Sequence, residues 1–186
     1  VLEGELNVAA LQSAFNQILQ RHEILRCTYH SEDGTPVQQI ETVQTLPIQR
    51  QQCVIEDPHA EQKAIQQLAD KDALTNFDLV NDLMLRVRLV GLISRNNSER
   101  SLLLINMHHI ASDGWSQDVL SDEIAQLYSA LSRGNTPELA ELPIQYADFA
   151  VWQREWLQGD VLDEQVSYWR DYLRDLPPVH HLPLDF

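Results

Sequence analysis

The chain has 186 residues, of which 44% are hydrophobic, and its formal net charge is −15. This length can form one domain with its own core, and the composition is too apolar for a disordered protein. The excess of carboxylates argues against partners such as nucleic acid, whose phosphates require Lys and Arg, and against anionic membrane surfaces. No apolar run approaches the ~20 residues of a membrane span, and no signal peptide is recognised.

The first half of the chain predicts a helix, a hairpin, a strand and a second helix. Asn7 can cap a helix that runs to about His22, because apolar residues recur at helical spacing after it. The turn signal Glu32-Asp33-Gly34 separates two short strand-like runs, over 27–29 and 37–40, which predicts a β-hairpin. Residues 46–54 form a weaker strand candidate. Asp57-Pro58 then starts a helix whose buried face carries Ala64, Ile65, Leu68 and Ala69.

The second half predicts two strands followed by three helices. Apolar residues from Leu83 to Leu89 alternate with Arg86 and Arg88, which indicates a half-buried strand. Residues 101–107 return as its antiparallel neighbour, in the centre of the sheet. Helical patterns follow over 119–131, 146–157 and 162–173, and the last two are rich in aromatic residues. We therefore expect an α+β fold, with a mixed or mostly antiparallel sheet and packed helices.

The stretch from Met107 to Ser116 joins the central strand to a helix and carries the candidate site. Adjacent residues of an extended chain point to opposite sides. We therefore expect at most one of His108 and His109 to face a given pocket, with the other buried and hydrogen-bonded. A zinc site needs three or four ligands, so we predict no metal. Gly114 either lets a substrate approach the backbone closely or is a turn residue with positive φ.

The two cysteines, Cys27 and Cys53, are too few for a disulfide framework and are not clustered as in a zinc knuckle. We expect buried thiols in a reducing cytoplasm.

Three separated elements resemble the condensation domains of nonribosomal peptide synthetases, within the wider group of chloramphenicol-acetyltransferase-like acyltransferases. Residues 21–26 resemble the family's R-H-E-x-L-R element, residues 107–116 its M-H-H-x-x-S-D-G-W-S element, and residues 146–152 its Y-x-D-[FY]-A-V-W element. Order and spacing also agree, and Phe77-Asp78-Leu79 and Tyr168-Trp169 fit weaker patterns. Two residues depart from the pattern, because Cys27 stands for Thr and Ala111 for Ile.

The family's opening Ser-x-Ala-Gln element and the motifs of its second half are absent. The resemblance therefore implies that residues 1–175 form the amino-terminal lobe of a two-lobed enzyme with the chloramphenicol-acetyltransferase-like fold. Residues 176–186, with the inert pair His180-His181, would be an extended exit segment towards a second lobe. Because the family's site lies between the lobes, we expect the isolated lobe to have little or no activity. Its apolar docking face would drive self-association.

The resemblance also implies the chemistry, which is amide bond formation between two thioesters held on phosphopantetheine arms of donor and acceptor carrier proteins. No cofactor is bound directly and no covalent nucleophile is needed. His109 would be the general base or hydrogen-bond the attacking amine, with His108 supporting it. Asp113 would be structural, in an ion pair with Arg26 or, second, Arg21; alternatively it orients the imidazole. Gly114, Trp152 and Tyr146 would support the site, although both aromatics could be plain core residues.

Three other functions share these features. An epimerisation domain has the same His-His-Asp-Gly pattern, but Gly114-Trp115-Ser116 favours condensation. A non-catalytic recruitment domain would have a degraded His-His element, which is intact here. A small-molecule acetyltransferase of the same fold would not explain the match at residues 146–152.

Overall fold

A computed structural model describes residues 1–43, 45–55, 57–94 and 100–177. The chain forms two units, Val1–Gln145 and Tyr146–Phe186, and each is described by itself. Most of the predicted exit segment, with His180 and His181, lies outside the described residues. In the described part of the chain, no helix has the length and apolar character needed to cross a membrane.

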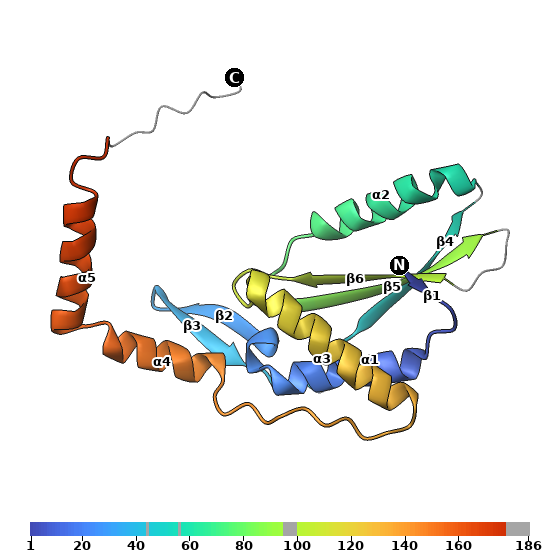
Figure 1. Ribbon diagram of the computed structural model, residues 1–186, viewed down its shortest axis with the longest axis horizontal. Helices are drawn as coiled ribbons and strands as arrows, with labels where there is room; N and C mark the ends of the chain where they lie inside the picture. Colours follow the sequence, from blue (N-terminus) through green and yellow to red (C-terminus); the bar gives the residue numbers. More distant parts are fainter. Residues whose placement is uncertain (44, 56, 95–99, 178–186) are drawn as a thin grey trace. The chain divides into compact units, whose positions relative to one another are not determined.

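A mixed four-stranded sheet forms the centre of the first unit (Figure 1). Its strands, in spatial order, are β1 (Leu2–Glu3), β6 (Arg100–Met107), β5 (Leu85–Ser94) and β4 (Ile48–Ile55). β6 pairs antiparallel with β1 and β5, and β4 runs parallel to β5. Parallel neighbours need a crossover, which a short 3₁₀ turn (Pro58–Ala60) and α2 (Glu61–Ala73) supply here. The predicted α+β fold, the mixed sheet and the interior position of β6 are confirmed.

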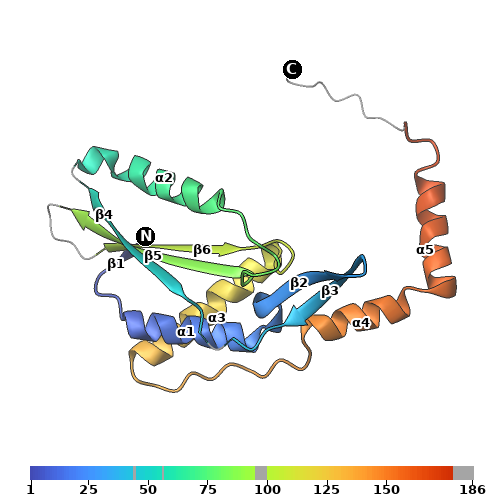
Figure 2. The same cartoon turned by 180° about the vertical axis from the view of Figure 1, so that it is seen from behind.

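Helices cover both faces of this sheet, as the two opposite views show (Figures 1 and 2). α1 (Val8–Arg21) and α3 (Gly114–Ser132) lie on one face and α2 on the other. Leu85, Val87 and Leu89 join the core beneath α1 and α3. Val90 and Leu92 instead pack with Ile65 and Leu68 of α2. Side chains of β5 thus alternate between two apolar layers.

Local signals explain the elements before the sheet. The Asn7 side chain accepts the Ala10 N–H at 3.0 Å and so caps α1, as predicted. A 3₁₀ turn (Glu23–Arg26) then leads into the hairpin of β2 (Cys27–Glu32) and β3 (Thr35–Ile40). The two loop residues, Asp33 and Gly34, have φ values of 50° and 81°. Positive φ at both positions is the requirement of the tight hairpin turn that Asp-Gly favours.

β5 has the predicted alternation of buried apolar residues and partly exposed arginines, and α2 covers much of the face that carries Arg86 and Arg88. Each arginine side chain is only 14% exposed. Arg88 Nη2 lies 3.2 Å from Oδ1 of Asp72, which is buried at the end of α2. The Asn106 amide of β6 donates to Asp72 Oδ2 at 3.1 Å and to its carbonyl oxygen at 3.0 Å. A buried ion pair with added hydrogen bonds therefore fastens α2 to the sheet.

The second unit contains two helices with exposed aromatic rows. On α4 (Tyr146–Trp156), neighbouring rings lie 5.6–5.8 Å apart between centroids, in the order Tyr146, Phe149, Trp152 and Trp156. On α5 (Gly159–Tyr172), Tyr168, Trp169 and Tyr172 contact one another. Neither helix contains a buried residue. The aromatic faces of α4 and α5 are therefore apolar surfaces that are not buried within the second unit.

We predict that Asp72→Ala destabilises the fold by ~3 kcal/mol, because it leaves the mostly covered guanidinium group of Arg88 without its counter-charge. Urea unfolding would measure the loss. Asp70→Ala is the matched control, since Asp70 is an exposed acid of the same helix, and its effect should stay within about 0.5 kcal/mol. Equal effects of the two variants would contradict the structural role of the buried pair.

Candidate active site

The site is the turn between β6 and α3, which begins at His108 and ends at Asp113. The His108 N–H donates to the Met84 carbonyl oxygen at 3.1 Å, so the turn starts from the end of the sheet. The His108 carbonyl oxygen accepts the Ala111 N–H at 2.9 Å and the Ser112 hydroxyl at 3.1 Å. The His108 carbonyl oxygen thus holds the turn from within, and the His108 N–H joins the turn to the chain before β5.

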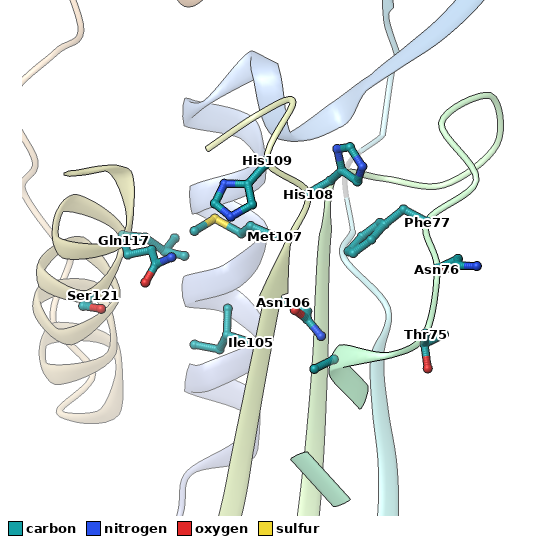
Figure 3. A pocket seen from close by; sticks show the side chains of 12 residues that line it. Thr75, Asn76, Phe77, Ile105, Asn106, Met107, His108, His109, Gln117 and Ser121 are labelled. Atoms are coloured by element: carbon teal, nitrogen blue, oxygen red, sulfur yellow. The ribbon is translucent and has the colours of Figure 1, made fainter. Parts of the chain in front are cut away.

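Both histidines line one hollow of about 780 Å³, so the prediction that at most one of them faces a given pocket is wrong. Figure 3 shows the two rings at the hollow, with Phe77 beside His108 and Gln117 on the side of His109. β6 ends at Met107, and the alternation of an extended strand no longer applies to the turn that follows. His109 is exposed and His108 is partly exposed.

In their neutral forms, the hydrogen bonds of the two rings assign them opposite tautomers. His109 Nδ1 lies 3.2 Å from the Ser112 carbonyl oxygen, which can only accept, so Nδ1 carries the proton. Its Nε2 is then an acceptor. His108 Nδ1 accepts the Ile110 N–H at 3.0 Å, so this nitrogen carries no proton. A ring with a fixed, unprotonated nitrogen is the arrangement that a general base requires, and His109 offers it through Nε2.

Asp113 caps α3 and is exposed, which contradicts its predicted place in a buried ion pair. Its Oδ1 accepts the Ser116 hydroxyl at 2.7 Å and the Ser116 N–H at 2.8 Å. The Ser116 Oγ in turn accepts the Asp113 N–H at 3.2 Å, which completes a capping box. These bonds, first the one from the Ser116 hydroxyl, hold the pKa of the Asp113 carboxyl below its usual value.

Neither predicted arginine partner contacts Asp113. Arg26 Nη2 pairs with Glu23 at 3.1 Å, and its Nη1 donates to the Glu41 carbonyl oxygen at 2.7 Å. Arg21 Nε instead pairs with an acid of α3, Glu123, at 3.0 Å. The alternative role, in which Asp113 orients the imidazole, is also wrong, because the Ser112 carbonyl oxygen holds His109.

Glu123 is the acid that the sequence analysis missed. Its second oxygen lies 2.6 Å from His22 Nε2, so one carboxylate binds both residues at the end of α1. Its side chain is 12% exposed. One sequence feature could have revealed Glu123: it lies three residues after Leu120, which puts it on the buried side of α3. This ion pair ties α1 to α3 beside a small apolar hollow of about 160 Å³, which includes His22, Ala111 and Trp115 in its lining.

The structure agrees only in part with the roles predicted for the three other residues that would support the site, Gly114, Tyr146 and Trp152. Gly114 is the first residue of α3 and does not have a positive φ, so the turn interpretation is wrong. A Cβ added there would meet no atom within 4 Å, which is open space for a close approach. Tyr146 and Trp152 lie on α4 in the second unit and are 55% and 54% exposed, so they are not buried core residues. Their support of the site stays a prediction.

The loop after α2 forms one wall of the hollow, through Thr75, Asn76 and Phe77. Each residue of Phe77-Asp78-Leu79 makes a structural contact, although the sequence indicated only a weak pattern there. The Phe77 ring contacts His108, with 5.7 Å between centroids. The Asp78 side chain accepts the Val80 N–H, which closes the loop, and the Leu79 carbonyl oxygen accepts the Tyr29 N–H of β2 at 2.8 Å.

Neither thiol lies at the hollow. Both cysteines are free, and burial raises the pKa of the Cys27 thiol, so it is a poor nucleophile. Within the described ranges, no group of three or more His, Cys, Asp and Glu side chains could hold a metal ion.

The family model of the condensation domain matches residues 1–186. A linear gramicidin synthase of Brevibacillus parabrevis is 44% identical over 99% of this chain, and gramicidin S synthase 2 of Aneurinibacillus migulanus is 39% identical over all of it. The chain belongs to the condensation domain family, which the sequence had indicated. It spans only 4% of each of these two synthetases.

Solved structures agree on the fold. The X-domain from teicoplanin biosynthesis is 31% identical, with a TM-score of 0.82, and this chain covers 40% of it. The epimerization domain from the third module of tyrocidine synthetase B has a TM-score of 0.80 at 23% identity, which shows a common fold alone.

We predict that Asp113→Ala lowers the unfolding temperature by about 2–4 °C, the range for losing one helix cap. His109→Ala should change it less, because His109 is exposed and its one ring bond is to a carbonyl of its own turn. Since the folded pKa of Asp113 is lowered, its contribution is present at neutral pH and is lost as the pH falls through that pKa. Thermal unfolding of both variants at neutral and acidic pH would check the order of the two effects and the pH dependence. A larger effect of His109→Ala than of Asp113→Ala would contradict the capping role.

Proposed function

We propose that this chain is the amino-terminal lobe of an amide-forming condensation domain. The donor would be an acyl or peptidyl thioester and the acceptor an aminoacyl thioester, each on the phosphopantetheine arm of a carrier protein in the cytoplasm. The observation that carries the proposal is the pair of histidines on one hollow, with His109 Nδ1 held by the Ser112 carbonyl oxygen, so that in the neutral ring Nε2 is the nitrogen that can accept a proton.

His109 would remove the proton of the attacking amine, or hold that amine by a hydrogen bond. An α-amine has a pKa of about 8, so a minority is already neutral near pH 7. A thiol with a pKa of about 8.5 leaves readily. The protein therefore has mainly to align amine and thioester and to manage one proton, for which an exposed imidazole on a rigid turn is suited. His108 would shape the turn, and the open space at Gly114 would admit the substrate arm.

Two alternatives are kept beside condensation, and both belong to domains that share this fold. The likeness to an epimerization domain leaves proton transfer at an α-carbon as a rival use of His109. The likeness to an X-domain, for which a complex with OxyB is also known, makes recruitment of a partner the other rival. The intact His108-His109 pair with its fixed tautomers favours a catalytic role over recruitment.

The second lobe would dock on the aromatic faces of α4 and α5. Four aromatic side chains of α4 are 37–55% exposed, and three of α5 are 52–70% exposed. Exposed apolar patches of this kind mark interaction sites, and the similar X-domain chain is longer than this one. Tyr146 and Trp152 would then support the active site by anchoring that docked lobe.

We predict that His109→Ala lowers condensation by ~10²–10⁴-fold, the usual contribution of a general base. The assay would use a two-lobed domain that contains this chain, with two loaded carrier proteins. His59→Ala is the matched control, because His59 is also exposed and lies on the 3₁₀ turn before α2, and it should leave the rate unchanged. No product from the folded domain would refute condensation, and α-hydrogen exchange on the bound substrate would then indicate epimerisation.

We also predict that residues 1–186 alone show little activity and self-associate through the aromatic faces. Sedimentation velocity at rising concentration should detect the association, and Trp152→Glu with Trp156→Glu should abolish it. The corresponding change at Leu74, which is 81% exposed on the first unit, is the control and should have no effect. A strictly monomeric fragment with full activity would contradict both expectations.

A further inference from the structure

Arg86 of β5 holds the wall of the hollow that stands next to His108. Its Nη1 donates to the Thr75 carbonyl oxygen at 3.1 Å and its Nη2 to the Asn76 carbonyl oxygen at 3.0 Å. The centre of its guanidinium group lies 4.2 Å from the centroid of the Phe77 ring. Asp82 Oδ2 lies 3.7 Å from Nη2 and balances the charge. One side chain therefore contacts three consecutive residues of the wall.

Phe77 transmits this restraint to His108. The two rings meet edge to face, with an interplanar angle of 73° and 5.7 Å between centroids. Edge-to-face contacts favour one relative orientation of the rings. Figure 3 shows Phe77 beside His108. Since His108 Nδ1 must point at the Ile110 N–H to accept it, a contact that limits rotation of the His108 ring also protects that hydrogen bond.

We propose that Arg86 is a positioning residue, which fixes Phe77 and through it the orientation of the His108 ring that shapes the turn carrying His109. It acts through other residues and touches no reacting atom. Its effect on the histidine rings follows from the contacts above, whereas its effect on turnover rests on the proposed function.

The geometry requires the guanidinium group and not merely a positive charge. Arg86 donates to two carbonyl oxygens while its plane contacts an aromatic ring. A lysine ammonium is a point charge without a planar fork and cannot make all three contacts at once. Arg86→Lys should therefore behave closer to Arg86→Ala than to the wild type.

The first test is NMR of the chain with ¹⁵N-labelled histidine, assigned with His108→Gln and His109→Gln. In the wild type, Nδ1 of His108 should have the shift of an unprotonated nitrogen and Nδ1 of His109 that of a protonated one. In Arg86→Ala, the Nδ1 shift of His108 should move towards the average of the two tautomers. An unchanged His108 shift would overturn the proposal.

Arg100→Ala is the matched control. Arg100 is a strand arginine that also pairs with an acid near α2, with 2.7 Å between its Nη1 and Glu61 Oε1. It lies at the opposite end of β6 from His108. It should lower the unfolding temperature without moving the His108 shift. If Arg86→Ala does not fold, Phe77→Leu tests the same contact without removing the arginine, and it too should shift the His108 signal.

The second test is the condensation rate of the two-lobed domain. Arg86→Ala should lower kcat about tenfold, a fraction of the ~10²–10⁴-fold that a base supplies, with KM for both carrier proteins unchanged. A change in KM alone would indicate a docking role and overturn the positioning one. If the folded two-lobed domain gave no condensation product while Arg86→Ala still shifted the His108 signal, the proposed function would fail and the positioning of His108 would stand.

Discussion

The hydrogen bond from the Ile110 N–H to His108 Nδ1 is the interaction on which the geometry of the site depends. Together with the bonds from the Ala111 N–H and the Ser112 hydroxyl to the His108 carbonyl oxygen, it closes the turn between the end of β6 at Met107 and the start of α3 at Gly114. An extended strand would separate the two imidazoles by the sheet. The turn instead brings both rings to one hollow, and the capping box at Asp113 fixes where the helix starts.

Regular elements could be predicted from the sequence because each has a local cause. The Asn7 cap, the Asp33-Gly34 turn and the apolar stripe of α3 all act over a few residues. The approximate bounds of these elements could therefore be predicted without knowing which other elements pack against them. The exception is β5, whose alternation was correct but whose polar face is covered by α2. Burial of Arg86 and Arg88 depends on a helix distant from them in sequence, so no local pattern could reveal it.

The sequence identified the residues of the site but not which charged side chains pair with one another. Family resemblance located the His108–Asp113 segment, but the partner of a charged side chain depends on how helices pack. Arg21 and His22 end α1, and the acid that faces them is Glu123 of α3, about a hundred residues away. Asp113 is nearer to the histidines in sequence but lies at a helix start, where the free N–H groups of the first turn compete for its carboxylate.

The opposite tautomers of His108 and His109 give the two adjacent residues different roles. His109 can take up a proton, and His108 holds the turn through a hydrogen bond. A proton that arrives at His109 Nε2 leaves the Nδ1–H bond to Ser112 intact, so the ring can change charge while the turn keeps its shape. A proton at His108 Nδ1 would remove the acceptor of the Ile110 N–H and so break one of the hydrogen bonds that shape the turn. The backbone therefore tolerates repeated charging of one imidazole only if its neighbour stays neutral. If the two roles were exchanged, each proton taken up by the exposed imidazole would break a hydrogen bond of the turn.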